Sequence, residues 1–389
     1  MKKLAVIFES SPFDRKGLFN AVHERVRHLV ASGEFEVDAY CIHSWDTAFT
    51  RRMRHTPEVA EKVDRVDVAG VEYRMLWYDF SVVDHILVEK LHVNPFFFAG
   101  FLNAHVSLLE GYDAVIAHSF TGGLFALRAR ELYGLPYFVS WHGSDVHTHP
   151  WRNPLILYKT REVMDKAERN FFVSHALLEE SGKITSVASK DVLYNGVSED
   201  FFMFPEMSRS EHRRNFGVTE DEKVVAFVGS IVDVKNVKML QPLFHEIRAR
   251  YQGALKFWMV GDGKMRSVVE PELMSDDSID VRMWGNVPSD KMPAVMNSID
   301  VLVLPSRNEG LPLVCAEAIR CGANVIGADV GGVSEIIGKD YVIPHGECFI
   351  ESMAVKVAGL LASREEQVVP ESMSWEKTAE KEKSFINAF

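Results

Sequence analysis

The sequence predicts an α/β protein made of two doubly wound, parallel-sheet domains. Its 389 residues are too many for one ordinary hydrophobic core and suit two domains of roughly 150 to 200 residues each. Short apolar runs alternate with longer amphipathic segments, which is the pattern of parallel strands joined by helices. The same alternation restarts after residue 200, so the chain carries this architecture twice.

Apolar runs mark the expected strands of the N-terminal half. They cover residues 4–8, 37–42, 114–117 and 137–141. The segment 20–32 between the first two runs has helical periodicity. The first run follows two lysines, as in a signal peptide, but it stops at Glu9 and no cleavage site follows. We therefore expect a buried first strand.

A second series of apolar runs marks the strands of the C-terminal half. They cover residues 224–228, 256–260, 281–283, 301–304 and 324–326. The segment 201–210 before them contains Pro205 and has the period of neither a strand nor a helix, so we expect the interdomain linker there. A serine-capped, charged helix begins at Ser374 with no strand after it, and residues 371–389 are expected to cross back onto the first domain.

Composition narrows the classes of function. A hydrophobic fraction of 47% with 25% charged residues is typical of a globular protein. The net charge of -12 disfavours a nucleic-acid partner. The four cysteines have neither a CxxC pair nor a metal-ligand spacing, which predicts a reducing cytosol and no zinc site. No apolar run reaches the ~20 residues of a membrane span.

The most informative loop covers residues 305–318 and directly follows the run 301–304. Ligands of open α/β sheets bind beyond the carboxyl ends of the strands. We expect a helix to begin near Leu311 or Pro312, so its free amides and positive dipole end would form an anion site. Glu309 precedes this helix and Glu317 lies about a turn and a half into it, so the two carboxylates could bracket a ligand. An isolated pair of glutamates is more often a helix cap and a solvated residue, so this interpretation depends on context.

The context is a family resemblance. The strand, loop and helix with two glutamates separated by seven residues resemble the signature of glycosyltransferase family 4. The resemblance covers most of the chain, is densest after residue 190, and extends through His142-Gly143-Ser144-Asp145, Asn195-Gly196-Val197, Trp284-Gly285-Asn286-Val287-Pro288 and Gly331-Gly332-Val333-Ser334-Glu335-Ile336-Ile337. It implies a retaining, hexosyltransferase-type enzyme of the GT-B fold, with two Rossmann-like domains facing a central cleft. Residues 1–200 would form the acceptor side and residues 201–370 would bind a nucleotide-sugar donor.

The resemblance also implies roles for individual residues in the C-terminal half. Glu309 would be catalytic and would contact the hydroxyls of the donor sugar, Glu317 would bind the ribose hydroxyls, and Lys235 would neutralise the diphosphate. The stretch that would hold the sugar and the distal phosphate is Gly310, Leu311, Pro312, Leu313 and Val314. The backbone around Gly285 and Val287 would face the nucleobase.

The sequence departs from the family pattern at Ser230. The family usually has an arginine directly after the glycine that ends this strand, so one cation for the diphosphate is missing. Arg307 or Lys238 is a candidate replacement, and the alternative is a greater contribution from the helix dipole and amides.

Two further site residues are expected in the N-terminal half. Gly17 follows the first strand, at the usual position of a loop under the donor phosphates. His142 follows the run 137–141, where the corresponding histidine of the family touches the transferred sugar, and its expected catalytic role is positioning or polarising. Asp145 is expected to cap the segment that follows.

No metal and no cofactor are expected, since the sequence contains no Asp-x-Asp motif and the nucleotide-sugar is a substrate. A nicotinamide enzyme is disfavoured, because Gly17 stands alone and Arg266 takes the place of the third glycine after Gly261-Asp262-Gly263.

Two alternatives stay open. One is a nucleotide-sugar epimerase or phosphorylase of the same fold, and the other is a degenerate binding subunit, which Ser230 keeps in consideration.

The expected partners are a UDP-sugar, favoured over a GDP-sugar, and a saccharide or lipid-linked saccharide acceptor of bacterial surface-polysaccharide or glycoconjugate biosynthesis. The basic run 51–55 and the aromatic stretch 96–101 suggest peripheral contact with the inner face of the membrane. The alternatives are a solvated loop and a buried core helix. The expected location is cytoplasmic.

Overall fold

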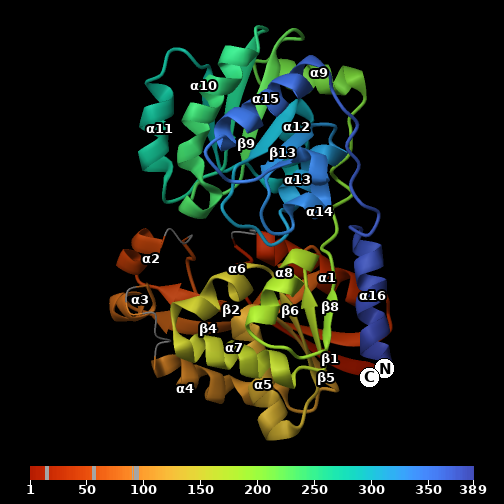
Figure 1. Ribbon diagram of the computed structural model, residues 1–389. Helices are drawn as coiled ribbons and strands as arrows, with labels where there is room; N and C mark the ends of the chain where they lie inside the picture. Colours follow the sequence, from red (N-terminus) through yellow and green to blue (C-terminus); the bar gives the residue numbers. More distant parts are fainter. Residues whose placement is uncertain (14–16, 55–57, 90, 92–95) are drawn as a thin grey trace. The chain divides into compact units, whose positions relative to one another are not determined.

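The computed structural model describes residues 1–13, 17–54, 58–89, 91 and 96–389. The chain divides into two compact units, one of residues Met1–Gly196 with Ser374–Phe389 and the other of residues Val197–Met373. Each unit is an α/β domain in which helices pack on a mainly parallel sheet (Figure 1), and this confirms the fold class predicted from the sequence.

The N-terminal unit contains an eight-stranded sheet in the order β3-β4-β2-β1-β5-β6-β7-β8. All neighbouring strands pair in parallel except β3 and β4. The strands are β1 (Lys2–Glu9), β2 (Phe35–Asp46), β3 (Arg65–Val68), β4 (Val71–Phe80), β5 (Ala114–His118), β6 (Tyr137–Trp141), β7 (Arg169–Phe172) and β8 (Lys190–Val192). The strand order reverses between β1 and β5, so the ligand-binding edge is expected where these two strands end.

The helices of this unit connect successive strands. In the described ranges they are α1 (Gly17–Ala31), α2 (Ala48–Arg54), α3 (Val82–Glu89), α4 (Phe96–His105), α5 (Ser119–Tyr133), α6 (Ser144–His147), α7 (Pro154–Lys166), α8 (His175–Glu180) and α16 (Trp375–Ala388). The last of these, α16, packs on α1 and brings the two chain ends close together (Figure 1), where Lys2 Nζ donates to the carbonyl of Ile386 at 2.8 Å.

A buried ion pair attaches α16 to the domain. Arg25 on α1 and Glu382 on α16 each have side chains that are 1% exposed. Arg25 Nε donates to Glu382 Oε2 at 2.9 Å, a second guanidinium nitrogen donates to the other carboxylate oxygen, and Nη1 donates to Ser140 Oγ at 2.8 Å. The terminal helix is therefore fastened to the interior of the N-terminal unit.

The C-terminal unit contains a six-stranded, fully parallel sheet in the order β11-β10-β9-β12-β13-β14. The strands are β9 (Lys223–Val228), β10 (Leu255–Val260), β11 (Val281–Gly285), β12 (Val301–Leu304), β13 (Asn324–Ala328) and β14 (Val342–Ile343). The α-helices are α9 (Glu206–Asn215), α10 (Leu240–Arg250), α11 (Arg266–Met274), α12 (Met292–Ser298), α13 (Leu313–Arg320), α14 (Val333–Ile337) and α15 (Phe349–Ala362). Here the strand order reverses between β9 and β12.

The predicted linker 201–210 is only partly correct, because α9 begins at Glu206. Pro205 stands just before the first turn and Glu206 places a negative charge at the positive end of the helix, and both features favour a helix start. The extended part is held by Asn297, whose Oδ1 accepts from the amide of Phe204 at 2.7 Å and whose Nδ2 donates to the carbonyl of Phe202 at 2.9 Å.

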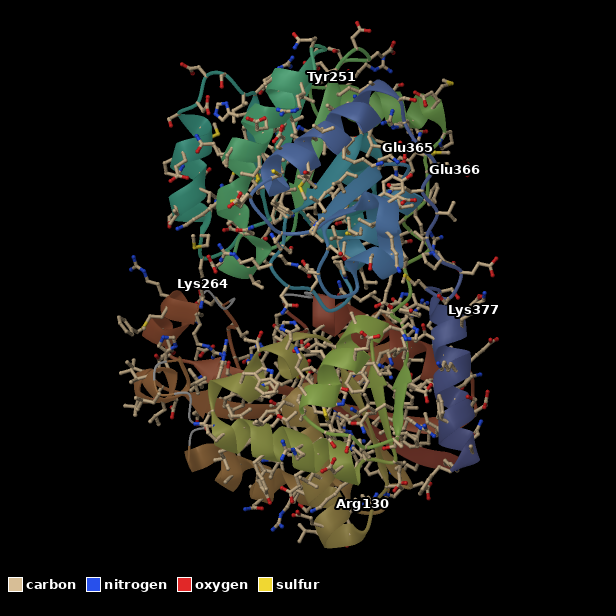
Figure 2. The ribbon with its side chains drawn as sticks, viewed as in Figure 1. Arg130, Tyr251, Lys264, Glu365, Glu366 and Lys377 are labelled. Carbon is tan, nitrogen blue, oxygen red and sulfur yellow. The ribbon has the colours of Figure 1, made fainter. Side chains whose placement is uncertain are left out.

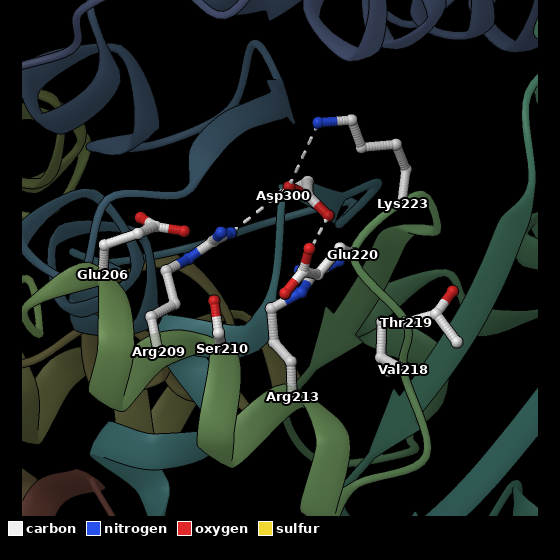
Figure 3. A pocket seen from close by; sticks show the side chains of 9 residues that line it. All are labelled: Glu206, Arg209, Ser210, Arg213, Val218, Thr219, Glu220, Lys223 and Asp300. Carbon is white, nitrogen blue, oxygen red and sulfur yellow. Dashed lines mark hydrogen bonds and ion pairs between the residues drawn. The ribbon is translucent and has the colours of Figure 1, made fainter.

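Asp300 fixes α9 on the sheet at the amino ends of β9 and β12. Its carboxylate contacts Arg209 at 3.3 Å, Arg213 at 3.1 Å and Lys223 at 3.7 Å, and it accepts from the amide of Val224 at 2.8 Å. These side chains line a pocket of about 270 Å³ (Figure 3). Since the two arginines also donate to backbone carbonyls, this pocket is a structural junction at the edge opposite to the strand carboxyl ends.

The segment after α15 is tied to the same sheet. Asn324 Nδ2 donates to the carbonyl of Glu365 at 2.7 Å, and the Glu365 side chain (Figure 2) accepts from the Tyr341 hydroxyl at 2.6 Å. Gln367 Oε1 accepts from the amide of Val325 at 2.6 Å. The chain thus stays with the C-terminal unit until Met373.

Candidate functional site

The candidate site of the C-terminal unit lies where β9 and β12 end. Lys235 follows β9 in a short 3-10 turn, and Glu309 follows β12. Lys235 Nζ donates to Glu309 Oε1 at 2.6 Å, and the side chains are 21% and 8% exposed. This ion pair therefore spans the point where the strand order reverses, which is the usual ligand position in such sheets.

The loop that carries Glu309 is held in place by the loop after β13. Gly331 has a φ of +52°, and a Cβ at this position would lie 1.9 Å from the carbonyl oxygen of Glu309. The amide of Gly332 donates to the carbonyl of Gly310 at 3.0 Å. Only glycine permits so close an approach, so the position of the Glu309 backbone is determined by its packing.

Helix α13 begins at Leu313, with Pro312 as its N-cap residue. The prediction of a start near Leu311 or Pro312 was therefore early by one or two residues. No side chain of the described residues caps the first turn, so the amides of Leu313 and Val314 lie at an uncapped positive end. Gly310 and Leu311 belong to the loop before the helix. This end follows β12 and lies at the carboxyl edge of the sheet.

Glu317 lies in the second turn of α13 and is half-buried. Burial raises the pKa of its carboxyl to about 7. Within the described part of the chain it has no hydrogen-bond or ion-pair partner, although carboxylates at buried positions normally have one. A ligand hydroxyl is the kind of group that would satisfy it.

Glycines at the ends of β9, β10 and β11 line the other side of the same edge. The amide of Gly229 donates to the carbonyl of Val260 at 2.9 Å, and the amide of Gly261 donates to that of Gly285 at 2.8 Å. A Cβ on Gly261 would lie 2.1 Å from the carbonyl oxygen of Gly229. The three loops are thus packed backbone against backbone. Gly285 ends β11 and Val287 follows it, and β10 and β9 separate β11 from β12, which Glu309 follows.

The structure brings Ser230 to the same edge with an exposed side chain. Of the two candidate replacements for the missing arginine, Arg307 donates to Asp233 at 2.6 Å, whereas Lys238 is exposed and has no ion-pair partner among the residues that the structure describes. Lys238 is therefore the freer cation of the two.

The N-terminal unit holds the other two predicted positions, Gly17 and His142. Gly17 is the first residue of α1, and a Cβ there would meet nothing within 4 Å. Its conformation therefore does not require glycine, and residues 14–16 of the predicted phosphate loop lie outside the described residues. His142 directly follows β6 and is half-buried.

The structure adds one residue that the sequence analysis missed. His118, the last residue of β5, is 1% exposed, and its Nδ1 lies 3.1 Å from Nε2 of His142. The prediction that Asp145 caps the segment that follows is wrong, because Asp145 lies inside α6 and its carboxylate accepts from the preceding amides of His142 and Gly143 at 3.1 and 2.8 Å. The position of His118 at the end of a strand beside β6 was the available signal.

Comparison with known proteins assigns both units to known families. Residues 16–196 match the glycosyl transferase 4-like domain, and residues 208–382 match the glycosyl transferases group 1. The chain consists of two glycosyltransferase domains. The residues quoted for the family resemblance had predicted this class, the glycosyltransferases, for the chain.

One bacterial relative matches just over half of this chain. The glycosyltransferase TuaC of Bacillus subtilis (strain 168), ascribed to teichuronic acid biosynthesis, is 31% identical over 228 residues, which are 58% of this chain and 56% of TuaC. The match thus spans little more than half the length of that relative.

Solved structures show that the two domains have the GT-B fold. Sucrose-phosphate synthase from Thermosynechococcus elongatus aligns with a TM-score of 0.76 at 17% identity, over 100% of this chain and 99% of that one. HepE of Anabaena in complex with UDP aligns with a TM-score of 0.73 at 16% identity, over 100% of both chains.

Two kinds of feature are absent from the described residues. Their helices include none with the length and hydrophobicity of a membrane span. Nor do three or more His, Cys, Asp or Glu side chains gather there in a group that could hold a metal ion.

Proposed function

We propose that the protein is a retaining, metal-independent glycosyltransferase that moves a hexosyl group from a nucleotide-sugar to a hydroxyl of a saccharide or lipid-linked saccharide. UDP-sugars are the proposed donor class, ahead of GDP-sugars, and HepE, which shares the fold, was solved with UDP and with UDP-glucose. The similarity to TuaC supports a role in bacterial surface-polysaccharide or glycoconjugate biosynthesis.

The observation that carries the proposal is the Lys235–Glu309 pair at the reversal point of the C-terminal sheet. Lysine supplies a positive charge for a diphosphate, and the buried carboxylate accepts from sugar hydroxyls. Both lie on the same edge as the amino end of α13, whose amides favour an anion. A sugar and a diphosphate thus have complementary partners within one short stretch of this edge.

The remaining donor contacts of the proposal are those that the family resemblance implies. Glu317 accepts from the ribose hydroxyls, and the backbone at Gly285 and Val287 faces the nucleobase. By the same resemblance, His142 would contact the transferred sugar. The bond from the sugar to the diphosphate breaks with the electron pair leaving on the phosphate oxygen. The acceptor hydroxyl then bonds to the same face of the cation-like sugar, and its proton passes to the leaving phosphate. Preorganised charges and amides supply the rate.

A nucleotide-sugar panel tests the proposal. We expect UDP and one UDP-sugar to raise the melting temperature, and transfer of a labelled sugar to an acceptor hydroxyl to continue in excess EDTA with the anomeric configuration retained. Binding without transfer to any acceptor would favour a degenerate binding subunit. Conversion of the donor in the absence of acceptor would favour an epimerase.

The affinity for UDP should depend on the protonation of Glu317. Burial raises the pKa of this carboxyl to about 7, and ribose hydroxyls stabilise the charged form. Below pH 7 most Glu317 carboxyls are therefore protonated and must lose that proton before they accept from the ribose. The affinity for UDP should fall about tenfold as the pH is lowered from 8 to 6. Calorimetric titrations of the wild type and of Glu317→Gln at several pH values measure the effect. The phosphate of UDP titrates equally with both proteins, so the difference between the two pH curves belongs to Glu317. Parallel pH curves for the two proteins would contradict the assigned role.

The substitution Ser230→Arg should tighten the binding of nucleoside diphosphates. The new guanidinium would add a charge-assisted hydrogen bond to the diphosphate, worth roughly a 5- to 150-fold gain in affinity. Ser230→Ala is the matched control, since it changes the same exposed position without adding a cation and should not tighten binding. An unchanged calorimetric affinity for the arginine variant would argue against the position of the diphosphate.

The proposed membrane contact rests on α2 and α3 rather than on the whole basic run. Arg54 is held by Asp46 at 2.6 Å and Arg51 by Glu58 at 3.1 Å, and His55 lies outside the described residues. In the aromatic stretch, Phe101 is 9% exposed and packs on Tyr78, so it does not face a lipid. The side chains of Phe96, Phe97 and Phe98 lie outside the described part of the structure. Large apolar side chains are exposed instead at Phe49, Met53, Val83, Ile86 and Leu91.

Vesicle sedimentation tests this contact. The double variant Phe49→Ser, Val83→Ser should bind vesicles of phosphatidylcholine and phosphatidylglycerol at least about tenfold more weakly than the wild type, because it removes two exposed apolar side chains that would enter the lipid. Leu132→Ser removes an exposed apolar side chain from α5, away from α2 and α3, and should have no effect. Equal binding of the two variants would reject the contact at α2 and α3.

A further inference from the structure

The two histidines of the N-terminal unit form a pair at the ends of adjacent strands. In the parallel pairing of β5 with β6, His118 lies opposite Ser140, and His142 follows two residues later. Nδ1 of His118 lies 3.1 Å from Nε2 of His142, and the ring centroids are 5.4 Å apart. The hydrogen bond thus uses Nε2 of His142 and leaves its Nδ1 for another group.

Both rings are held neutral by their surroundings. Burial lowers the pKa of both imidazoles, and the positive charge of Arg25 lowers it further, to about 3 for His142. A neutral imidazole has one N–H, so one of the two facing nitrogens donates and the other accepts. The tautomer of His142 is therefore coupled to that of His118.

The turns that carry the two rings are connected through one buried carboxylate. Asp145 accepts from the amides of His142 and Gly143 and from the side chain of Ser119, the residue after His118. Ser119 has a φ of +62°, a left-handed conformation that is unfavourable for serine and persists only where the surroundings enforce it. The backbone of the two turns is therefore held by this carboxylate, and the ring of His142 is held by its hydrogen bond to His118.

We propose that His118 is a positioning residue, which fixes the ring orientation and a single tautomer of His142 so that Nδ1 of His142 presents one fixed hydrogen-bonding group to the transferred sugar. The proposal rests on the proposed role of His142. No bond is made or broken at His118. Without this partner, the His142 ring would populate both tautomers and a flipped orientation, and only part of the population would be productive.

Nitrogen-15 NMR of histidine-labelled protein tests the coupling without any substrate. In the wild type at pH 7, His142 should show one neutral tautomer. In His118→Phe, which keeps a ring but has no hydrogen-bonding nitrogen, His142 should show averaged tautomers. His118→Asn places an amide near the former Nδ1 and should restore a single tautomer. A protonated or averaged His142 in the wild type would overturn the proposal, and this measurement needs no variant to fold.

Kinetics then test the consequence. We expect His118→Phe to lower kcat about tenfold with the donor KM unchanged, and His118→Asn to recover most of the loss. His85→Phe is the matched control, since His85 is a buried histidine of the same unit whose Nδ1 has no partner in the described ranges, and its kcat should be unchanged. A kcat for His118→Phe within twofold of the wild type would overturn the proposal. Absence of transfer in the wild type would instead reject the proposed function and leave the NMR result standing.

Discussion

Replacing Glu309 with glutamine should lower kcat by about 100- to 1000-fold, the usual effect of removing one preorganised group from a transition-state site. The carboxylate is 8% exposed and its backbone is held by Gly331, so the glutamine amide should occupy the same place with the same shape. The substitution removes the negative charge of the group that accepts hydrogen bonds from the sugar hydroxyls. The affinity for UDP should stay within about threefold, because UDP has no transferred sugar and Lys235 remains available for its phosphates.

Steady-state kinetics with the donor found in the panel and calorimetry with UDP separate these two effects. Glu272→Gln makes the same chemical change at an exposed position on α11 and should leave both quantities unchanged. Undiminished transfer by Glu309→Gln would remove the catalytic assignment. A loss of UDP binding equal to the loss of kcat would mean that Glu309 supports the nucleotide rather than the reacting sugar.

The fold was largely predictable because parallel strands buried on both faces read as continuous apolar runs. Every predicted run lies within a strand or forms most of one, as in β1 and β12. Five strands of the described ranges were missed. β3 and β7 have four residues each, β8 has three and β14 has two, which is too short for a clear apolar run. β4 is longer, but polar residues interrupt its apolar ones.

The site was less predictable because its geometry depends on contacts between distant segments. The order of strands explains why Lys235 and Glu309 meet, but only the structure shows that Gly331 holds the Glu309 loop. The pairing of His118 with His142 likewise needs the neighbouring positions of β5 and β6. The burial of Arg25 was readable from the sequence, because it shares the buried face of α1 with Val22, Val26 and Leu29. Its partner was not, because Glu382 lies 357 residues away.

Removing that partner should produce the largest change in stability. In Glu382→Ala the Arg25 guanidinium would stay buried, and among the described residues the Ser140 hydroxyl would be its one remaining hydrogen-bond acceptor. An unpaired buried charge costs about 3–5 kcal/mol in the free energy of unfolding. The cost should fall on the N-terminal unit, because both partners belong to it. Hydrogen exchange resolved by unit, together with denaturant unfolding, measures the loss and its location.

The adjacent residue provides a matched control. Lys383 on α16 pairs with Glu34, in the turn after α1, at 2.7 Å, and these side chains are 23% and 41% exposed. Lys383→Ala should therefore cost less than about 1 kcal/mol. The double variant Arg25→Met, Glu382→Leu replaces both charges with apolar groups and should be more stable than Glu382→Ala. If Glu382→Ala and Lys383→Ala were equally stable, the buried pair would not be what fastens α16. If the double variant were the least stable, packing of the guanidinium rather than its charge would hold the helix.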